Sequence, residues 1–455
     1  MSVAGVGLFL VFFAMPGWGA TTTYENLTGS DAITIASGDT GVAQTTNSAF
    51  TGNWIVNGTL QSMNGSSQTP DNALGSGTVT LNNGAKLLPG VANTTHLSNP
   101  VVINGNVTLG GENMELRFSG PISGSGSISR NTYWSVYLLG DNSAYAGDWN
   151  LNTDWTWSLN QWSTPQTGWA GSGDYSFGSG TITLNKGGIA FANGSTDYYV
   201  WNDLVVTQAH ANFMKGGKSV TLLGKLSGAG NIALQTVGSG SSAVYSTPTV
   251  HVRGTENGTF SGNWTINAGY TLTTNNYGST KETGDSTLGS GQIILNGGTL
   301  QTVDTKEYSS NAWLRRISND IVVNDNSTLS STANTEMYLF GNISGVGNLT
   351  ENVTYSLYLR GDNSAYKGNW TLTGDWTWSY NTSASAGDGW AGTGDYSFGS
   401  GTVTLNGGGI SFASGSTDYY VWNDLVVTQA HANFMKGGKS VTLSGKLTGE
   451  GDIQL

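Results

Sequence analysis

A long internal duplication constrains this chain more than any other feature of its sequence. Residues Gly194 to Leu222 recur without a change as Gly415 to Leu443, at an offset of 221 residues. Around this segment the phrases GDNSAY, DWTWS, GDYSFGSGT and GGKSVTL recur in the same order, up to Leu455 in the second copy. Self-similarity of this kind is the signature of a repeat architecture, in which each repeat buries its apolar surface against its neighbours.

A shorter repeat lies inside the duplication. An aromatic-x-Gly-Asn/Asp-Trp phrase opens four units, and it ends at Trp54, Trp149, Trp264 and Trp370. A Gly-Ser-Gly phrase follows in each unit, and units one and three are alike, as are two and four. We therefore expect an N-terminal cap or leading coil over residues 20–49 and a solenoid over 50–455. Its four units run over about 50–144, 145–259, 260–365 and 366–455, and we expect the last one to be truncated.

Short alternating segments predict the fold class. Apolar and polar residues alternate in Thr181-Ile-Thr-Leu184 and in Ser219-Val-Thr-Leu222, as they do in half-buried strands, and Asn-Gly corners follow such segments. The units of about 105 residues divide into about five strand-turn segments, whereas propeller blades repeat at roughly 40 to 50 residues. We predict an all-β fold, a right-handed parallel β-helix (β-solenoid) of repeated coils with apolar residues inside and asparagines stacked in ladders.

Charge and composition narrow the choice of partners. The formal net charge is -12 and the pI is near 4.6, without any run of Lys or Arg, so nucleic acid is not expected as a partner. The chain has no Cys, which excludes disulfides and thiolate metal sites. Its four His are scattered without the spacing of metal ligands. We predict no cofactor and no bound metal.

The amino terminus reads as an export signal. The apolar run from Val3 to Met15 is shorter than the roughly 20 residues that span a bilayer, and small residues precede Ala20. This pattern predicts a signal peptide over residues 1–19 and an exported protein at the cell surface or outside the cell, in a bacterial envelope. The run lacks a preceding Lys or Arg, and the alternative interpretation is a buried core segment.

Four phrases together resemble a known repeat family. The combination of LxGDNSAYxGxW, xLGSGxVTLNxGxL, VVINGNVTLGG and SGPISGSGSIS is similar to the autotransporter-associated β-strand repeat, also called the passenger-associated transport repeat, over about Phe50 to Leu455. The resemblance implies a secreted, surface-displayed β-helical passenger whose partner is an outer-membrane barrel or translocation machinery. The sequence departs from that pattern because no membrane β-barrel precedes its end, so we expect a fragment or another anchor.

Two sets of residues are candidates for catalysis. Asp197, Asp203 and His210 are echoed by Asp418, Asp424 and His431, and β-helical polysaccharide enzymes use paired carboxylates. Their spacing does not bring two carboxylates onto one bond, so we interpret the Asp residues as turn caps and the His residues as solvated. We predict no catalytic residue and no enzyme.

Clustered aromatic residues are the candidate ligand contacts. They are Trp155, Trp157, Trp162 and Trp169 in one unit, and Trp376, Trp378 and Trp390 in another. Exposed rings stack on sugars, whereas alternate rings on a strand also stack between adjacent coils. The first hypothesis is therefore a structural, adhesive protein that contacts glycans or a host or neighbouring-cell surface. The alternatives are a secreted carbohydrate-binding module and a polysaccharide-degrading β-helix.

Overall fold

The structure is a computed structural model of the full chain. The structure describes residues 19–44, 47–63, 73–90, 94–111, 115–131, 135–153, 156–158, 175–191, 197–208, 214–216, 218–237, 244–245, 248–253, 257–274, 287–303, 314–332, 335–374, 376–379, 396–412, 418–429 and 435–453. These residues fall into two compact units. Unit 1 holds those up to Asn160 together with Tyr175–Gly180, and unit 2 holds those from Thr181 onward.

Unit 1 contains three parallel sheets. The first consists of β1 (Thr21–Tyr24), β3 (Thr40–Ala43), β5 (Thr59–Ser62), β7 (Lys86–Pro89), β10 (Val107–Leu109), β13 (Ile128–Arg130) and β15 (Trp149–Leu151). The second consists of β2 (Ile33–Ile35), β4 (Trp54–Val56), β6 (Val79–Leu81), β9 (Val101–Ile103) and β12 (Ile122–Gly124). The third consists of β8 (Thr94–Leu97), β11 (Glu115–Phe118), β14 (Val136–Leu138) and β16 (Thr156–Ser158).

Unit 2 also has three main parallel sheets. The first consists of β19 (Asp197–Val200), β22 (Ser219–Leu222), β27 (Thr249–Val252), β29 (Thr271–Thr274), β31 (Thr299–Thr302), β34 (Ser327–Ser331), β37 (Leu349–Asn352), β39 (Trp370–Leu372), β41 (Val403–Leu405), β44 (Leu425–Val427) and β47 (Leu447–Gly449). The second consists of β24 (Ile232–Leu234), β28 (Trp264–Asn267), β30 (Ile293–Asn296), β33 (Ile321–Asp325) and β36 (Ile343–Gly345). The third consists of β32 (Leu314–Ile317), β35 (Glu336–Leu339), β38 (Ser356–Leu359), β40 (Thr377–Ser379), β42 (Ile410–Phe412) and β45 (Met435–Lys436).

Shorter elements complete unit 2 and the turns. Strands β17 (Ile182–Leu184), β20 (Leu204–Val206) and β23 (Leu226–Gly228) pair in parallel in this order. Strand β18 (Ile189–Phe191) pairs in parallel with β21 (Met214–Lys215). Strand β43 (Asp418–Val421) pairs in parallel with β46 (Ser440–Leu443). Strands β25 (Thr236–Val237) and β26 (Val244–Tyr245) pair antiparallel. Three short 3₁₀ turns are η1 (Tyr175–Phe177), η3 (Asn257–Thr259) and η4 (Tyr396–Phe398). Within the described ranges there is no α-helix, and hence none that is long and apolar enough to cross a membrane.

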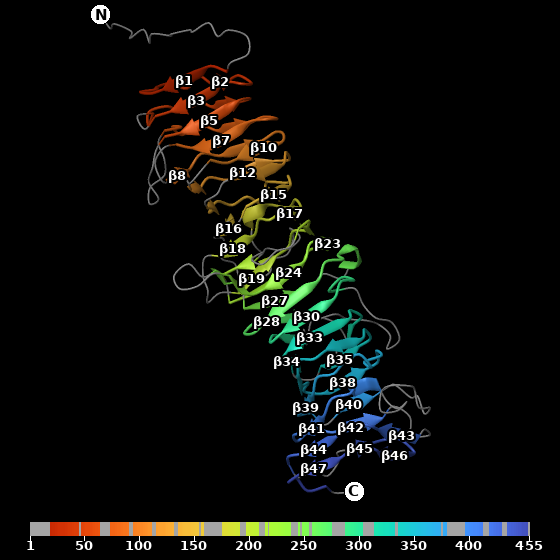
Figure 1. The fold of residues 1–455 in the computed structure, drawn as a ribbon. Helices are drawn as coiled ribbons and strands as arrows, with labels where there is room; N and C mark the ends of the chain where they lie inside the picture. Colours follow the sequence, from red (N-terminus) through yellow and green to blue (C-terminus); the bar gives the residue numbers. More distant parts are fainter. Residues whose placement is uncertain are drawn as a thin grey trace, which may run out of the picture. The chain divides into compact units, whose positions relative to one another are not determined.

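Three strands in sequence make one coil of a parallel β-helix. Strands β9, β10 and β11 pair in parallel with β12, β13 and β14 of the next coil. Strands β3, β5 and β7 likewise lie side by side as parallel neighbours (Figure 1). Hydrogen bonds between neighbouring coils typically join residues 20 to 25 apart in the sequence. The prediction of an all-β, parallel β-helical solenoid built from repeated coils is therefore confirmed.

The alternation of side chains along each short strand produces the core. Most three-residue strands have a buried, half-buried, buried pattern, as in Val79-Thr80-Leu81 and in Val403-Thr404-Leu405. Successive side chains of a strand point to opposite faces, so the Val, Leu and Ile residues turn inward and the Thr residues turn outward. Stacking the coils lines up these apolar side chains into one continuous interior in each unit.

The aromatic-x-Gly-x-Trp phrase anchors the interior of every repeat. All four tryptophans are completely buried, and each indole N–H donates to a backbone carbonyl: Trp54 to Leu74, Trp149 to Phe177, Trp264 to Leu288 and Trp370 to Phe398. The preceding ring packs edge-on against the indole, for example at 5.7 Å between the centroids of Tyr366 and Trp370. Each phrase therefore fills the core and pairs its polar atom at the same time.

A buried asparagine three residues before each phrase joins neighbouring coils. In the fourth repeat, Asn363 accepts a hydrogen bond from the backbone N–H of Ile343 at 2.7 Å and donates to the carbonyl of Ser397 at 2.7 Å. The corresponding residues in the other repeats make the same two kinds of bond: Asn47, Asn142 and Asn257. Because a buried amide is costly to leave unpaired, these residues fix the spacing of three successive segments.

The Gly-Ser-Gly phrase makes a tight corner that a second asparagine clamps. Gly399 has a φ of +65°, and a Cβ added there would lie 2.2 Å from the carbonyl oxygen of Tyr366. The side-chain amide of Asn423 donates to the carbonyls of Gly399 and Gly401 at 2.9 and 2.7 Å. Asn99 and Asn319 clamp the equivalent glycines in other repeats. Glycine is required because both the conformation and the close backbone contact exclude a side chain.

Outward asparagines form ladders, as the sequence predicts. In unit 1 Asn104 donates to Asn82 and Asn82 donates to Asn57, at 3.3 and 2.9 Å between Nδ2 and Oδ1. In unit 2 a ladder of the same kind runs from Asn324 through Asn296 to Asn267. Each rung of a ladder ties one corner to the corner of the preceding coil.

The repeats do not contain a whole number of coils. Within unit 1 the strand carrying Trp54 (β4) belongs to the second sheet, whereas the strand carrying Trp149 (β15) belongs to the first. Within unit 2 the strands carrying Trp264 (β28) and Trp370 (β39) differ in the same way. Consecutive repeats therefore place the same sequence phrase on different faces, which explains why alternate units resemble each other most.

Candidate functional site

The outer face of the third sheet differs chemically from the other outer faces in both units. Outward strand positions of the first and second sheets are mostly Thr, Ser, Asn, Val and Ile. The third sheet instead presents charged and aromatic side chains: Glu115, Arg117 and Tyr137 in unit 1, and Arg316, Glu336, Tyr338, Tyr358, Trp376, Trp378 and Lys436 in unit 2. In each unit we call this surface the third face.

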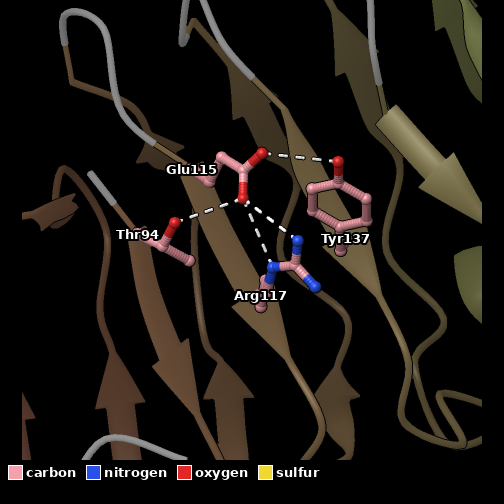
Figure 2. A network of polar contacts seen from close by, with 4 residues as sticks. All are labelled: Thr94, Glu115, Arg117 and Tyr137. Carbon is pink, nitrogen blue, oxygen red and sulfur yellow. Dashed lines mark hydrogen bonds and ion pairs between the residues drawn. The ribbon is translucent and has the colours of Figure 1, made fainter. Parts of the chain in front are cut away.

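A carboxylate organises the third face of unit 1 (Figure 2). Glu115 on β11 accepts hydrogen bonds at Oε2 from Thr94 at 3.3 Å and from Nε and Nη2 of Arg117 at 3.3 and 3.2 Å. Its Oε1 faces the phenol of Tyr137 at 3.4 Å. The Arg117 guanidinium lies over the Tyr137 ring, 4.2 Å from its centroid. Strands β8, β11 and β14 thus bring four residues of three coils into one network.

Partial burial sets the electrostatics of this network. The side chains of Glu115 and Arg117 are 17% and 23% exposed, so their ion pair is shielded but still reachable from solvent. Burial raises the pKa of Tyr137, and the carboxylate of Glu115 adds to that shift. The Tyr137 phenol is therefore neutral at physiological pH and serves as a hydrogen-bond donor.

The duplication carries the same carboxylate into unit 2 in a closed form. Glu336 occupies the position equivalent to Glu115, and Tyr338 stands where unit 1 has Arg117. The phenols of Tyr338 and Tyr358 donate to Glu336 at 2.9 and 3.2 Å. Burial raises the pKa of Tyr358 to about 12 and raises that of Tyr338 as well. With only 7% exposure at Glu336, this copy is part of the packed structure.

Four rings of unit 2 form a continuous stack. Tyr338 and Tyr358 lie 4.0 Å apart between centroids with planes 7° apart, and Trp378 follows Tyr358 at 5.7 Å and 8°. Trp376 lies 5.8 Å from Trp378 at 15°. The first three rings come from β35, β38 and β40, where they are paired in register across neighbouring coils. Exposure rises along the stack from 1% at Tyr338 to 41% at Trp376.

The tryptophans predicted from the sequence as ligand contacts lie in different places. Trp376 and Trp378 lie on the third face, and the ammonium of Lys436 lies 3.4 Å from the ring centroid of Trp376. Trp157 lies in β16, in register with Tyr137 on β14. Four others fall outside the described residues: Trp155, Trp162, Trp169 and Trp390.

The candidate catalytic carboxylates take part in contacts between coils. Asp197 accepts a hydrogen bond from the hydroxyl of Ser219 at 2.7 Å, and its other oxygen lies 3.7 Å from Nζ of Lys218. Asp203 accepts from the backbone N–H of Lys225 at 2.7 Å. Asp418 and Asp424 make the equivalent contacts in the second copy. His210 and His431 lie outside the described residues.

Sequence reasoning missed Glu115 and Glu336. Each is the first residue of a short strand, β11 or β35, and nothing in those strand sequences marks it. Only their hydrogen bonds with tyrosines of the next coil distinguish them. The available signal was the 221-residue offset, which places one acid in each copy while the residue two positions later changes from Arg to Tyr. In the part of the chain that the structure covers, no group of three or more His, Cys, Asp or Glu is arranged to hold a metal ion.

In unit 1 the third face carries a reachable carboxylate and guanidinium, and in unit 2 the third face carries partly exposed indoles. Such groups bind polyhydroxylated ligands, because carboxylate and guanidinium exchange hydrogen bonds with hydroxyls and rings pack on apolar C–H faces. Comparison with known proteins adds no relative: the chain matches no family model, and searches of the curated proteins and of the solved structures give no significant match.

Proposed function

We propose that this chain is an exported β-solenoid that is displayed at the surface of a bacterial cell and has a structural and adhesive role. The resemblance of its repeats to the autotransporter-associated repeat motivates export and display. The parallel coils support a structural role, because within each unit every coil is held by the next through paired strands.

One observation carries the proposal more than any other. The polar groups that would be candidates for chemistry are used to hold coils together: Asp203 binds a backbone N–H of the next coil, and Glu336 receives two phenols. A carboxylate engaged in this way is poorly placed to act as a general acid or base. The arrangement favours a scaffold over an enzyme.

Export is tested by expressing the full chain with an epitope tag in a Gram-negative host. A Leu10→Arg substitution places a charge inside the apolar run that we interpret as a signal peptide. We expect the parent protein to be cleaved by a protease added to whole cells and the variant to be retained inside and protected. A Thr22→Arg variant, beyond the run, is the matched control. Equal protease sensitivity of L10R and the parent would contradict export through this segment.

A second candidate function is carbohydrate binding. It is favoured by Trp376, which is 41% exposed beside Trp378 on the third face. Screening the protein on an array of bacterial and host glycans would identify ligands, and Trp376→Ala should abolish binding to them. Val346→Ala, at a 69% exposed turn residue away from the third face, is the control. A ligand that binds W376A as well as the parent would place the binding surface elsewhere.

A further inference from the structure

The stack of four aromatic rings in unit 2 connects the protein surface to a buried pair of phenols. Trp376 is the exposed end and Tyr338 the buried end, and consecutive centroids lie 4.0 to 5.8 Å apart with nearly parallel planes. The chain has no Cys, so tyrosine and tryptophan are its side chains most readily oxidised by one electron. We propose that Tyr338, Tyr358, Trp378 and Trp376 form a hole-transfer chain that carries a one-electron oxidation from the surface to the phenols beside Glu336.

The hydrogen bonds of the stack determine where the oxidation ends. An oxidised indole becomes more stable when its N–H proton has an acceptor, yet Nε1 of Trp378 is buried and has no hydrogen-bond partner among the described residues. Tyr338 is different, because its phenol donates to Glu336 at 2.9 Å. The oxidised phenol can therefore pass its proton directly to a carboxylate, and the resulting neutral radical is the favoured end state.

Charges at the outer end favour movement inward. The ammonium of Lys436 lies 3.4 Å from the Trp376 ring centroid and disfavours positive charge on that ring. At the inner end Arg316 is paired in register with Tyr338, so a cationic residue is a neighbour of this ring as well. The feature that favours oxidation at Tyr338 is therefore its direct hydrogen bond to Glu336. Burial keeps the phenols neutral by raising their pKa, so loss of the electron is coupled to loss of the proton.

The step balances with a one-electron oxidant such as a photogenerated ruthenium(III) polypyridyl complex. The oxidant gains one electron from the Trp376 ring. Trp378 then reduces the oxidised Trp376, and the tyrosine pair reduces the oxidised Trp378. The Oη proton of Tyr338 moves to Oε2 of Glu336. The products are the reduced oxidant, a neutral tyrosyl radical and a protonated Glu336.

The test uses the full chain and this bulky oxidant, which reacts with exposed rings. Freeze-quenched samples report the tyrosyl radical by electron paramagnetic resonance, and peptide mass mapping reports oxygenated Trp376. Trp378→Phe keeps a ring in the stack but removes the oxidisable indole. The double variant Y338F/Y358F shows how much of the tyrosyl signal comes from these two residues. We expect W378F to lose most of that part of the signal and to accumulate more oxygenated Trp376 than the parent.

Two further variants complete the design. Glu336→Gln keeps the side-chain shape but removes the proton acceptor, so the tyrosyl yield should fall while Trp376 oxidation rises. Trp422→Phe changes an indole that stacks on Tyr420 outside the chain of four, and it should match the parent in both measurements. Circular dichroism confirms that each variant keeps its β-structure. A folded W378F protein with parental tyrosyl yield and parental Trp376 oxidation would overturn the proposal.

Discussion

The phenol of Tyr366 donates a hydrogen bond to the backbone carbonyl of Gly347, 2.8 Å away in the preceding coil. Tyr145 makes the same contact with Gly126 at 2.7 Å in the second repeat, whereas the first and third repeats have Phe50 and Phe260 at this position. The contact distinguishes the two kinds of repeat and ties neighbouring coils through a side chain.

Removing this phenol should weaken the stack measurably. We expect Tyr366→Phe to lower the free energy of unfolding by about 1 kcal/mol, because a buried carbonyl loses its partner without a change in packing. Urea denaturation followed by fluorescence checks the value. Phe260→Leu, which changes the ring in a repeat without the phenol, controls for loss of packing. A Y366F protein as stable as the parent would mean that the hydrogen bond contributes nothing net.

The buried tryptophans should be the most sensitive core positions. Trp370→Ala removes a completely buried side chain and leaves the carbonyl of Phe398 unpaired, so we expect a loss of about 3 to 5 kcal/mol in unfolding free energy. Trp376→Ala, at a partly exposed indole, should cost far less. Thermal unfolding of the two variants side by side decides the matter, and equal destabilisation would argue against the assigned core.

Two glycines with similar backbone angles should respond differently to alanine. Gly399 (φ +65°) lies against the Tyr366 carbonyl, whereas a Cβ at Gly407 (φ +82°) would meet only the Gln429 side chain at 3.5 Å. We expect Gly407→Ala to cost about 1 kcal/mol from the backbone angle alone and Gly399→Ala about 3 kcal/mol or more from angle and clash together. Denaturant midpoints measure both. Equal costs at the two positions would show that the corner at Gly399 relaxes and that the close contact contributes nothing.

His251 should make the stability depend on pH. Burial, followed by the charge of Arg253, lowers the pKa of His251 from 6.5 to about 4. The unfolded chain therefore binds the proton more readily than the folded one, so the stability that the neutral imidazole provides is complete above pH 6.5 and is lost as the pH falls toward 4. The loss amounts to at most about 3 kcal/mol. Chemical denaturation between pH 7 and 4 measures it, and His251→Gln should flatten this part of the profile.

Local patterns predicted the fold because they are encoded within a few residues. The alternation in Thr181–Leu184 and the Asn-Gly corners determine strands and turns, and the repeats imply stacking. The partners of Asn363 could not be predicted, because Ile343 and Ser397 become its neighbours only once the register of the coils is known. The contacts of the third face could not be predicted for the same reason. Glu336 and Tyr358 come together through the parallel pairing of β35 with β38, and the sequence spacing between the two residues does not predict that pairing.

The asparagine ladders give the solenoid a chemical direction. In every step from Asn104 to Asn57 and from Asn324 to Asn267, the amide nitrogen of the later residue donates to the oxygen of the earlier one. The amide dipoles therefore point the same way and polarise one another along the column. A side chain added at the later end of such a column must therefore bring a donor, and one added at the earlier end must bring an acceptor.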